Sequence, residues 1–424
     1  MMRKDYLIFL ILVYLWMIMV QPQNRFPILG EIHFEKIVIV TSWLVLLIRD
    51  VGRIKTSSIT PLILILYVVM FLSYLHSPYK DFFQADHWLR NYWKYLVFYF
   101  LVLFATDDLA DLFYLFVGIV VILAVYQSHS WIDFLRGAYV WQAGMKRMVG
   151  VWSEGIGAAN YYGMITLFSL PFAVFWFQIT ENKKLKISLV LYLIMSLLSI
   201  LYSGTRGAMV GVLFFGLINI RRSQHIKVAA VLCVLFIILS ISVVPDYLKN
   251  RYLTLIPVVA GENGETTDRV YEDQLKSAES RWTGLVDGWN LMKEEPIFGH
   301  GPGSSPLARK KVNDELRSNS EEDYQMHNLY GQLLGETGLL GSMLFFWIII
   351  AYFSQLRGLR SFTGKDRNLN CYRVVLQNSM LLMLFYGFAS HSLFRFYWFL
   401  LFACEGSLLD VCRRSLKGKQ AGTI

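Results

Sequence analysis

His327 is the residue of this sequence best placed for proton-transfer chemistry, because it stands where a long polar segment, 246–327, meets a long apolar one. An imidazole changes charge near neutral pH and can therefore take up or release a proton there. At a membrane edge, facing a large polar loop, such a group is expected to act on a substrate. The other interpretation is an interfacial histidine that bonds to backbone beside Asn328, a helix cap.

The residues after His327 favour the first interpretation. They place four small side chains on the side of the expected helix that carries His327: Gly331, Gly335, Gly338 and Ser342. A stripe of this kind lets another helix approach closely, so that His327 would face a packed cleft instead of lipid. Glu336 lies about two turns deeper, and a carboxylate inside a span is usually paired and functional, although it can also satisfy a neighbour.

Arg206 is a candidate for binding an anion on the same side of the membrane. It lies in the turn 202–208, Tyr-Ser-Gly-Thr-Arg-Gly-Ala, between two apolar runs. A guanidinium among accessible backbone N–H groups suits phosphate oxygens. The alternative is an arginine that snorkels from a span end to the interface.

Arg281 is a second anion-binding candidate. It follows Ser280, which is a plausible N-cap for a helix over 281–293. An anion would be favoured near that helix terminus. The alternative is a solvated arginine paired with Glu279 or Asp287.

The composition indicates the class of protein in which these residues sit. Of 424 residues, 55% are hydrophobic, and the mean hydropathy is +0.44. Soluble proteins are seldom so apolar, and several apolar runs reach the length of a membrane span. We expect an all-α polytopic membrane protein with one integral membrane domain over 1–424, because barrel strands would alternate apolar and polar residues.

Twelve transmembrane helices and one large outer loop, 246–327, are predicted, with the loop before the tenth span. The spans cover 5–21, 36–49, 59–76, 92–105, 111–127, 160–178, 187–203, 206–220, 226–245, 328–354, 373–390 and 393–411. Within the loop, the spacing over 269–293 predicts a helix that Pro296 ends, and 299–303 form a tight turn.

The distribution of Lys and Arg sets the expected orientation. With the N-terminus inside, these residues are about twice as numerous in the inner segments as in the short outer ones. Both termini are therefore expected in the cytoplasm and the 246–327 loop on the outer face. The formal charge of +9 does not by itself indicate a nucleic-acid partner, and none is expected.

Other polar groups are weaker candidates. The acidic run 107–111 resembles a metal site, but no second acidic cluster accompanies it, so a short solvated inner loop is expected. His300 sits in a Gly/Pro turn and is expected to be structural. His391 lies near Arg395, and its spacing does not assign it to the same cleft as His327. The four cysteines show neither a disulfide framework nor zinc spacing, and no metal is expected.

Taken in chain order, these motifs resemble the O-antigen ligase and polymerase superfamily of bacterial membrane glycosyltransferases. Four segments carry the resemblance: Arg147 in Arg-Met-Val-Gly followed by Asn160; 203–207, Ser-Gly-Thr-Arg-Gly; Ser280 and Arg281 leading to 296–301; and His327, Asn328 and Tyr330 with 336–341. The motifs span roughly 145–345, and the layout of spans extends the likeness to the whole chain. The tripeptide 158–160, Ala-Ala-Asn, departs from the Asn-Pro-Asn of many members.

The resemblance implies an inverting, metal-independent glycosyl transfer without a cofactor, at the periplasmic face of the bacterial inner membrane. The donor would be a glycan on undecaprenyl diphosphate. The acceptor would be a sugar hydroxyl, on lipid A–core for a ligase or on another lipid-linked repeat for a polymerase. By the same resemblance Arg206 and Arg281 would bind the donor diphosphate and His327 would be the base. Supporting roles would fall to Arg147, Asn160, Asn328, Tyr330 and Glu336.

Elementary chemistry agrees with this assignment. The outer face has no nucleotide supply, so a transferase there needs an activated donor that arrives in the membrane. Two arginines can stabilise a diphosphate leaving group without a metal. A histidine that deprotonates a sugar hydroxyl can contribute roughly 10²–10⁴-fold in rate. We therefore predict that Arg206, Arg281 and His327 converge on one outward-facing cleft.

Several alternatives stay open. Ligase is favoured over polymerase, and transfer of glycan to protein is a further sibling activity. A transporter of polysaccharide or lipid-linked sugar should show charges at the membrane midplane and paired repeats. The expected spans carry few charges, chiefly Glu336, Glu405 and Asp410, which favours an enzyme at the outer surface. The oligomeric state is open as well.

Overall fold

The computed structural model describes residues 2–48, 55, 57–81, 83–142, 145–150, 158–220, 245, 248, 268–313, 325–360 and 366–421. The chain divides into two compact units. The first comprises Met1–Arg49, Ala110–Lys276 and Asn378–Tyr386, and the second comprises Asp50–Leu109, Ser277–Gln377 and Gly387–Ile424. The described residues are almost wholly helical, which confirms the all-α prediction.

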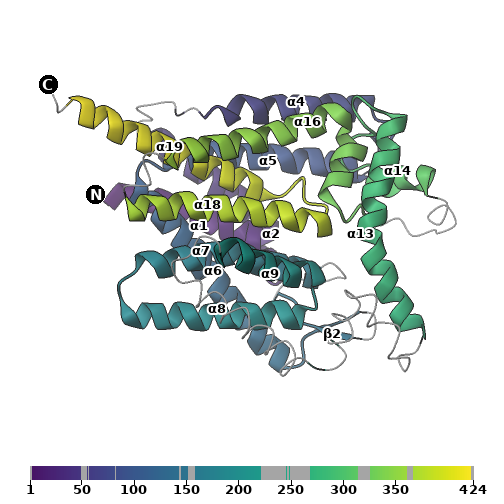
Figure 1. Cartoon of the computed structure of the whole chain (residues 1–424), viewed down its shortest axis with the longest axis horizontal. Helices are drawn as coiled ribbons and strands as arrows, with labels where there is room; N and C mark the ends of the chain where they lie inside the picture. Colours follow the sequence, from purple (N-terminus) through teal and green to yellow (C-terminus); the bar gives the residue numbers. More distant parts are fainter. Residues whose placement is uncertain are drawn as a thin grey trace. The chain divides into compact units, whose positions relative to one another are not determined.

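Figure 1 shows the helices of both units. The first unit holds α1 (Met2–Val20), η1 (Pro22–Asn24), α2 (Pro27–Glu31), α3 (Phe34–Ile48), α6 (Leu109–Leu135), α7 (Ala158–Ile179), α8 (Lys183–Ser203) and α9 (Arg206–Ile220). The second holds α4 (Ile59–His76), α5 (Phe83–Ala105), α14 (Ser305–Val312), α16 (Leu329–Gly358), η2 (Gly387–Ala389) and α19 (Phe396–Ala421). Two further helices, α13 (Asp268–Glu294) and α18 (Arg367–Tyr386), are divided between the units, and the first residue of α6, Leu109, belongs to the second unit. One short antiparallel hairpin, β1 (Val140–Gln142) and β2 (Met145–Arg147), pairs Val140 with Arg147.

Among the described residues, five helices are long and apolar enough to cross a membrane: α4, α6, α7, α8 and α16. Two shorter apolar helices cover Tyr6–Val20 in α1 and Arg206–Asn219 in α9. The chain is thus a helical membrane protein, while the count of twelve spans stays a prediction. Its ninth span, 226–245, lies almost entirely outside the described residues.

Hydrogen bonds between helices hold the interior of the first unit together. Tyr192 on α8 donates to Ser169 on α7 at 2.6 Å, and Ser196 on α8 donates to Gln127 on α6 at 3.0 Å. In a helix bundle built largely of apolar residues, such pairs satisfy polar groups that would otherwise be buried alone. They fix α6, α7 and α8 against one another.

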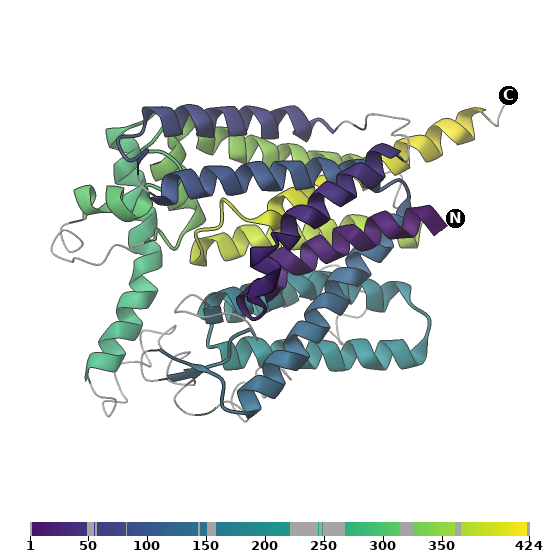
Figure 2. The same ribbon diagram turned by 180° about the vertical axis from the view of Figure 1, so that it is seen from behind.

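Four helices run side by side in the second unit, α4 against α16 and α5 against α19. Figure 2 shows the same arrangement from behind. Beyond one end of α16, α13 runs across the direction of these helices (Figures 1 and 2). The predicted helix over 269–293 is confirmed, and its end before Pro296 follows from the missing N–H of proline.

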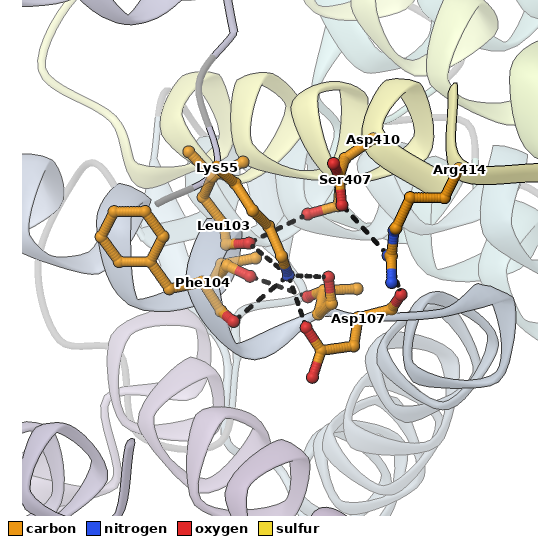
Figure 3. A network of polar contacts seen from close by, with 9 residues as sticks. Lys55, Leu103, Phe104, Asp107, Ser407, Asp410 and Arg414 are labelled. Carbon is orange, nitrogen blue, oxygen red and sulfur yellow. Dashed lines mark hydrogen bonds and ion pairs between the residues drawn. The ribbon is translucent and has the colours of Figure 1, made fainter. Parts of the chain in front are cut away.

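A buried lysine fastens the end of α5 (Figure 3). The Lys55 ammonium donates to the carbonyls of Leu103 at 3.1 Å and Phe104 at 3.2 Å, and to that of Thr106. It also pairs with Asp107 at 2.9 Å. The lysine thereby satisfies carbonyls that the last turn of a helix leaves without partners. Its positive charge also interacts favourably with the negative end of the helix dipole.

The expectation of a simply solvated acidic loop at 107–111 is therefore wrong. Asp107 is bound to Lys55, and Asp111 is buried in the first turn of α6, where the helix dipole favours an anion. On the other side of Asp107, its carbonyl accepts from Arg414, which pairs with Asp410 at 3.0 Å. The run links α5 to α19 within the second unit.

Replacing Lys55 with methionine should lower the free energy of unfolding by about 1–3 kcal/mol, because the α5 carbonyls and Asp107 lose their buried cation. Thermal unfolding of the purified protein in detergent would measure this. The matched control is Lys94→Met, since Lys94 is exposed. Equal unfolding temperatures for the two variants would contradict the anchoring role of Lys55.

Candidate active site

The site is built on a crossing of α13 and α16 in which glycines stand face to face. A Cβ atom added to Gly284 would lie 1.9 Å from the carbonyl oxygen of Met326, and one added to Gly288 would lie 2.2 Å from that of Gly331. A Cβ on Gly335 would be 3.4 Å from the Cα of Gly288. The small-residue stripe predicted on α16 thus does receive another helix, and that helix is α13.

Further along α16, the backbone breaks at Gly338, whose φ of 61° is left-handed. The turn after α13 fills the break, because Leu339 N–H donates to the carbonyl of Pro296 at 2.8 Å. Gly299 in that turn also has a positive φ, of 67°, and a Cβ there would lie 2.6 Å from the nitrogen of Gly338. Both positions require glycine, because an L side chain would be strained and would meet backbone.

His300 belongs to the same turn and has a structural place, as expected. Its N–H donates to the carbonyl of Gly335 at 2.9 Å, and its carbonyl accepts from the Ser77 hydroxyl. The side chain is buried, with Nε2 3.4 Å from Glu294. Burial and then the Lys311 charge lower the pKa of His300.

His327 lies at the edge of α16 with its side chain exposed. Its φ is 47°, in the left-handed region that non-glycine residues rarely occupy, and such strain is concentrated at functional sites. Asn328 is the N-cap of α16, as predicted, and its Oδ1 accepts from the N–H groups of Tyr330 at 2.9 Å and Gly331 at 3.1 Å. The cap fixes the backbone immediately after His327.

The other end of the Asn328 amide reaches two further elements. Its Nδ2 donates to the carbonyl of Arg281 on α13 at 3.1 Å and to that of Phe388 in η2 at 3.4 Å. The Tyr330 ring packs against Phe388, with centroids 4.4 Å apart. Asn328 therefore joins three elements at the position next to His327, and the backbone of Arg281 lies beside it.

Arg281 does not stand at a helix start. α13 begins at Asp268, so Arg281 is in its middle and Ser280 is not its N-cap. The argument from a helix terminus is therefore wrong, and binding of an anion by the guanidinium itself stays a prediction. Arg281 is half-buried.

Asp287, which the sequence offered as a partner for Arg281, is buried against Arg309 of α14. The guanidinium reaches Asp287 at 2.8 Å through Nε and 2.7 Å through Nη2. Its Nη1 donates to the carbonyl of Gln325 at 2.8 Å. This ion pair ties α13 and α14 to the segment that leads into His327. The sequence did not predict it, because nothing local relates two residues that are 22 positions apart.

Glu336 is buried and bound on several sides. It accepts from the Ser305 hydroxyl at the start of α14 and from Gln332 Nε2 at 3.2 Å. Gln332 Oε1 in turn accepts from the N–H of Leu393 at 3.2 Å. Glu336 thus holds neighbours in place, and Gln332, four residues before it on one helix face, was not singled out from the sequence.

His391 lies against His327, with ring centroids 5.4 Å apart and planes tilted by 58°. Burial most of all, and then the charges of His327 and Arg395, lower the pKa of His391 well below its usual value. Arg395 itself lies over the Trp88 ring at 5.9 Å. The sequence named His391 without assigning it to this site, since no spacing relates it to His327.

Arg147 is fully buried in the first unit. It donates through Nε to the carbonyl of Ser203 at 2.8 Å and through Nη2 to Asn160 at 2.8 Å and Thr205 at 3.4 Å. Gln142 accepts from its Nη1. Arg147 and Asn160 therefore brace the turn that carries Arg206, which is a positioning role.

The turn itself contains only Gly204 and Thr205 between α8 and α9. Gly204 caps α8 with a left-handed φ of 62°. Thr205 N–H donates to Ser203 Oγ at 3.2 Å, and Thr205 Oγ1 donates to the carbonyl of Ala159 at 2.9 Å. Arg206 follows as the first residue of α9 and is 2% exposed. The tight turn that the sequence predicted is confirmed.

The structure thus groups the predicted residues into two sets. His327, Arg281, Asn328, Tyr330 and Glu336 lie in the second unit, and Arg147, Asn160 and Arg206 lie in the first. The convergence of Arg206 with Arg281 and His327 stays a prediction. Within the described ranges, no three His, Cys, Asp or Glu side chains gather as a metal ion would require.

Replacing Gly288 with alanine should destabilise the fold by about 1–3 kcal/mol, because the new methyl group meets the Gly331 carbonyl and forces α13 away from α16. Gly358→Ala is the control, since a Cβ there meets nothing within 4 Å. Thermal unfolding of both variants checks this. A Gly288→Ala protein as stable as Gly358→Ala would show that the two helices do not cross so closely.

Comparison with known proteins gives a match that covers part of the chain. A search of curated proteins found no significant match to the chain. Residues 191–346 match a family model described as O-antigen ligase. The matched segment includes Arg206, Arg281, His327 and Glu336. This part of the chain is therefore similar to the O-antigen ligase family.

Proposed function

We propose that this protein transfers a glycan from undecaprenyl diphosphate to a sugar hydroxyl at the periplasmic face of the inner membrane, with His327 as the base. The observation that carries the proposal is the placement of His327. Its imidazole is exposed on a strained backbone at the edge of a candidate membrane span, and Asn328 ties that edge to Arg281. The match to the O-antigen ligase family supports the same activity class.

In the proposed reaction the acceptor hydroxyl gives its proton to His327. The oxygen forms a bond to the anomeric carbon of the donor sugar, while the bond from that carbon to the phosphate oxygen breaks. The electron pair leaves with the diphosphate. A single displacement of this kind inverts the anomeric configuration, and a base with a pKa near ambient pH serves it best.

The leaving diphosphate needs positive charge where its own charge develops. Arg281, half-buried beside the Asn328 cap, is proposed to supply part of it. Arg206 is proposed to supply the rest, held by the turn that Arg147 and Thr205 brace. A guanidinium donates two parallel hydrogen bonds to phosphate, which a lysine cannot reproduce.

Ligase is proposed ahead of polymerase because the matched family is described as O-antigen ligase. For a ligase the acceptor is lipid A–core. For a polymerase it is another lipid-linked repeat. A transporter is less favoured, since Arg206 begins α9, His327 precedes the N-cap of α16, and Arg281 lies on α13, which is not among the candidate spans.

A deletion strain tests the activity directly. Loss of the protein should leave lipid A–core without attached polymer while lipid-linked polymer accumulates, as seen by lipopolysaccharide gel profiling. A single repeat still attached to the core would identify a polymerase. An unchanged profile would contradict both.

Complementation with His327→Ala should fail, with transfer reduced at least roughly 10²-fold, because the acceptor hydroxyl loses its base. His129→Ala is the matched control, since His129 is an exposed histidine of α6 in the other unit. Immunoblotting confirms equal amounts in the membrane. Full complementation by His327→Ala would show that His327 is not the base.

Arg281→Lys should reduce transfer nearly as much as Arg281→Ala, because a lysine keeps the charge but loses the paired hydrogen bonds. The loss expected for such an electrostatic contact is roughly 10²–10³-fold in rate. Transfer by the purified protein in nanodiscs, with lipid-linked donor and lipid A–core, measures it. Wild-type activity of Arg281→Lys would show that Arg281 does not bind the diphosphate through paired hydrogen bonds.

A further inference from the structure

His391 is a titratable group beside His327 to which the proposed mechanism gives no role. Its ring lies against that of His327, with centroids 5.4 Å apart, although 64 residues separate them in sequence. At this distance a small rotation brings a nitrogen of each ring within reach of one hydrogen bond. A general base is commonly oriented by a third group of this kind.

The segment that carries His391 is fixed immediately after this residue. After it, Leu393 N–H donates to Gln332, which is held in turn by Glu336. The carbonyl of Ser392 accepts from Trp398 Nε1 at 2.7 Å. Hydrogen bonds to the two residues that follow His391 leave its backbone little freedom. They therefore help to keep the imidazole beside that of His327.

The surroundings keep His391 neutral. Burial is the main cause that lowers its pKa, followed by the charges of His327 and Arg395. Its Nδ1 is buried and has no hydrogen-bond partner in the described part of the chain, so the ring still has a nitrogen that can bond to a neighbour. A neutral imidazole can accept a hydrogen bond from a protonated neighbour without a charge of its own.

We propose that His391 is a positioning residue for His327: the unprotonated nitrogen of its ring accepts the N–H of His327 and stabilises the imidazolium that forms when the acceptor hydroxyl is deprotonated. The inference rests on the proposed function. It assigns the proton to His327, the more exposed ring, since two adjacent imidazoles do not both take up a proton readily.

The charge of the side chain at position 391 decides how far it would raise the pKa of His327. A carboxylate in this place would raise the pKa of His327 and leave the base protonated at neutral pH, whereas a neutral imidazole raises it less. The charge of Arg395, in the same segment, acts in the opposite direction on this pair, since it lowers the pKa of His391.

Two substitutions should move the pKa of His327 in opposite directions. With His391→Glu the anion favours the imidazolium, so the acid limb of the rate profile should shift to higher pH by about one unit or more. With His391→Ala the imidazolium loses its acceptor, so the limb should shift to lower pH and the maximal rate should fall roughly 10- to 100-fold. His391→Gln keeps a side-chain hydrogen-bond acceptor and should retain more activity than His391→Ala.

Two readouts follow these shifts in the full-length protein in nanodiscs. One is the pH profile of glycan transfer. The other is the rate at which diethyl pyrocarbonate modifies His327, followed by mass spectrometry against pH, because this reagent attacks only the neutral ring. The control is His129→Glu, which should leave both midpoints unchanged.

Unmoved midpoints in both His391→Glu and His391→Ala would overturn the inference, as would a wild-type rate in His391→Ala. Such results would leave the proposed function intact, provided His327→Ala is inactive. If the wild-type protein transfers no glycan, the proposed function fails. In that case the diethyl pyrocarbonate titration still decides whether His391 sets the pKa of His327.

Discussion

The close approach of α13 to the first turns of α16 is the constraint on which the rest of the site depends. Four glycines, two on each helix, remove the side chains that would keep the backbones apart. The approach brings the Arg281 carbonyl within reach of Asn328 and seats the turn after α13 in the break at Gly338. His327 takes its left-handed conformation at the end of this assembly, where the backbone on either side is already fixed.

Most of the buried polar groups here hold backbone segments, and few are left for chemistry. Arg309, Glu336 and Gln332 each bind a segment next to a candidate residue. Arg147 does the same in the other unit, and its guanidinium is used on Ser203, Asn160 and Thr205. A buried polar group that is fully bonded specifies one arrangement, and the cost of breaking it is high.

The helices and the position of His327 could be predicted from the sequence because apolar runs, capping residues and turn residues act locally. The Asn328 cap, the Gly204 turn and the end of α13 before Pro296 are examples. The contacts between distant segments could not. Nothing local relates His391 to His327 or Arg309 to Asp287. Arg281 was misplaced at a helix start because Ser280 is a good N-cap by type, while the helix had already begun at Asp268.

The break at Gly338 has a consequence for depth in the membrane. From the break to its end α16 has about 20 residues, a rise of about 30 Å, which matches the hydrocarbon core of a bilayer. The turns before the break, 329–337, add a rise of about 13 Å. A polyprenyl lipid keeps its chain in the hydrocarbon and its diphosphate in the headgroup layer. On the proposed mechanism, the number of residues after Gly338 would set the height in the bilayer at which sugar and base meet.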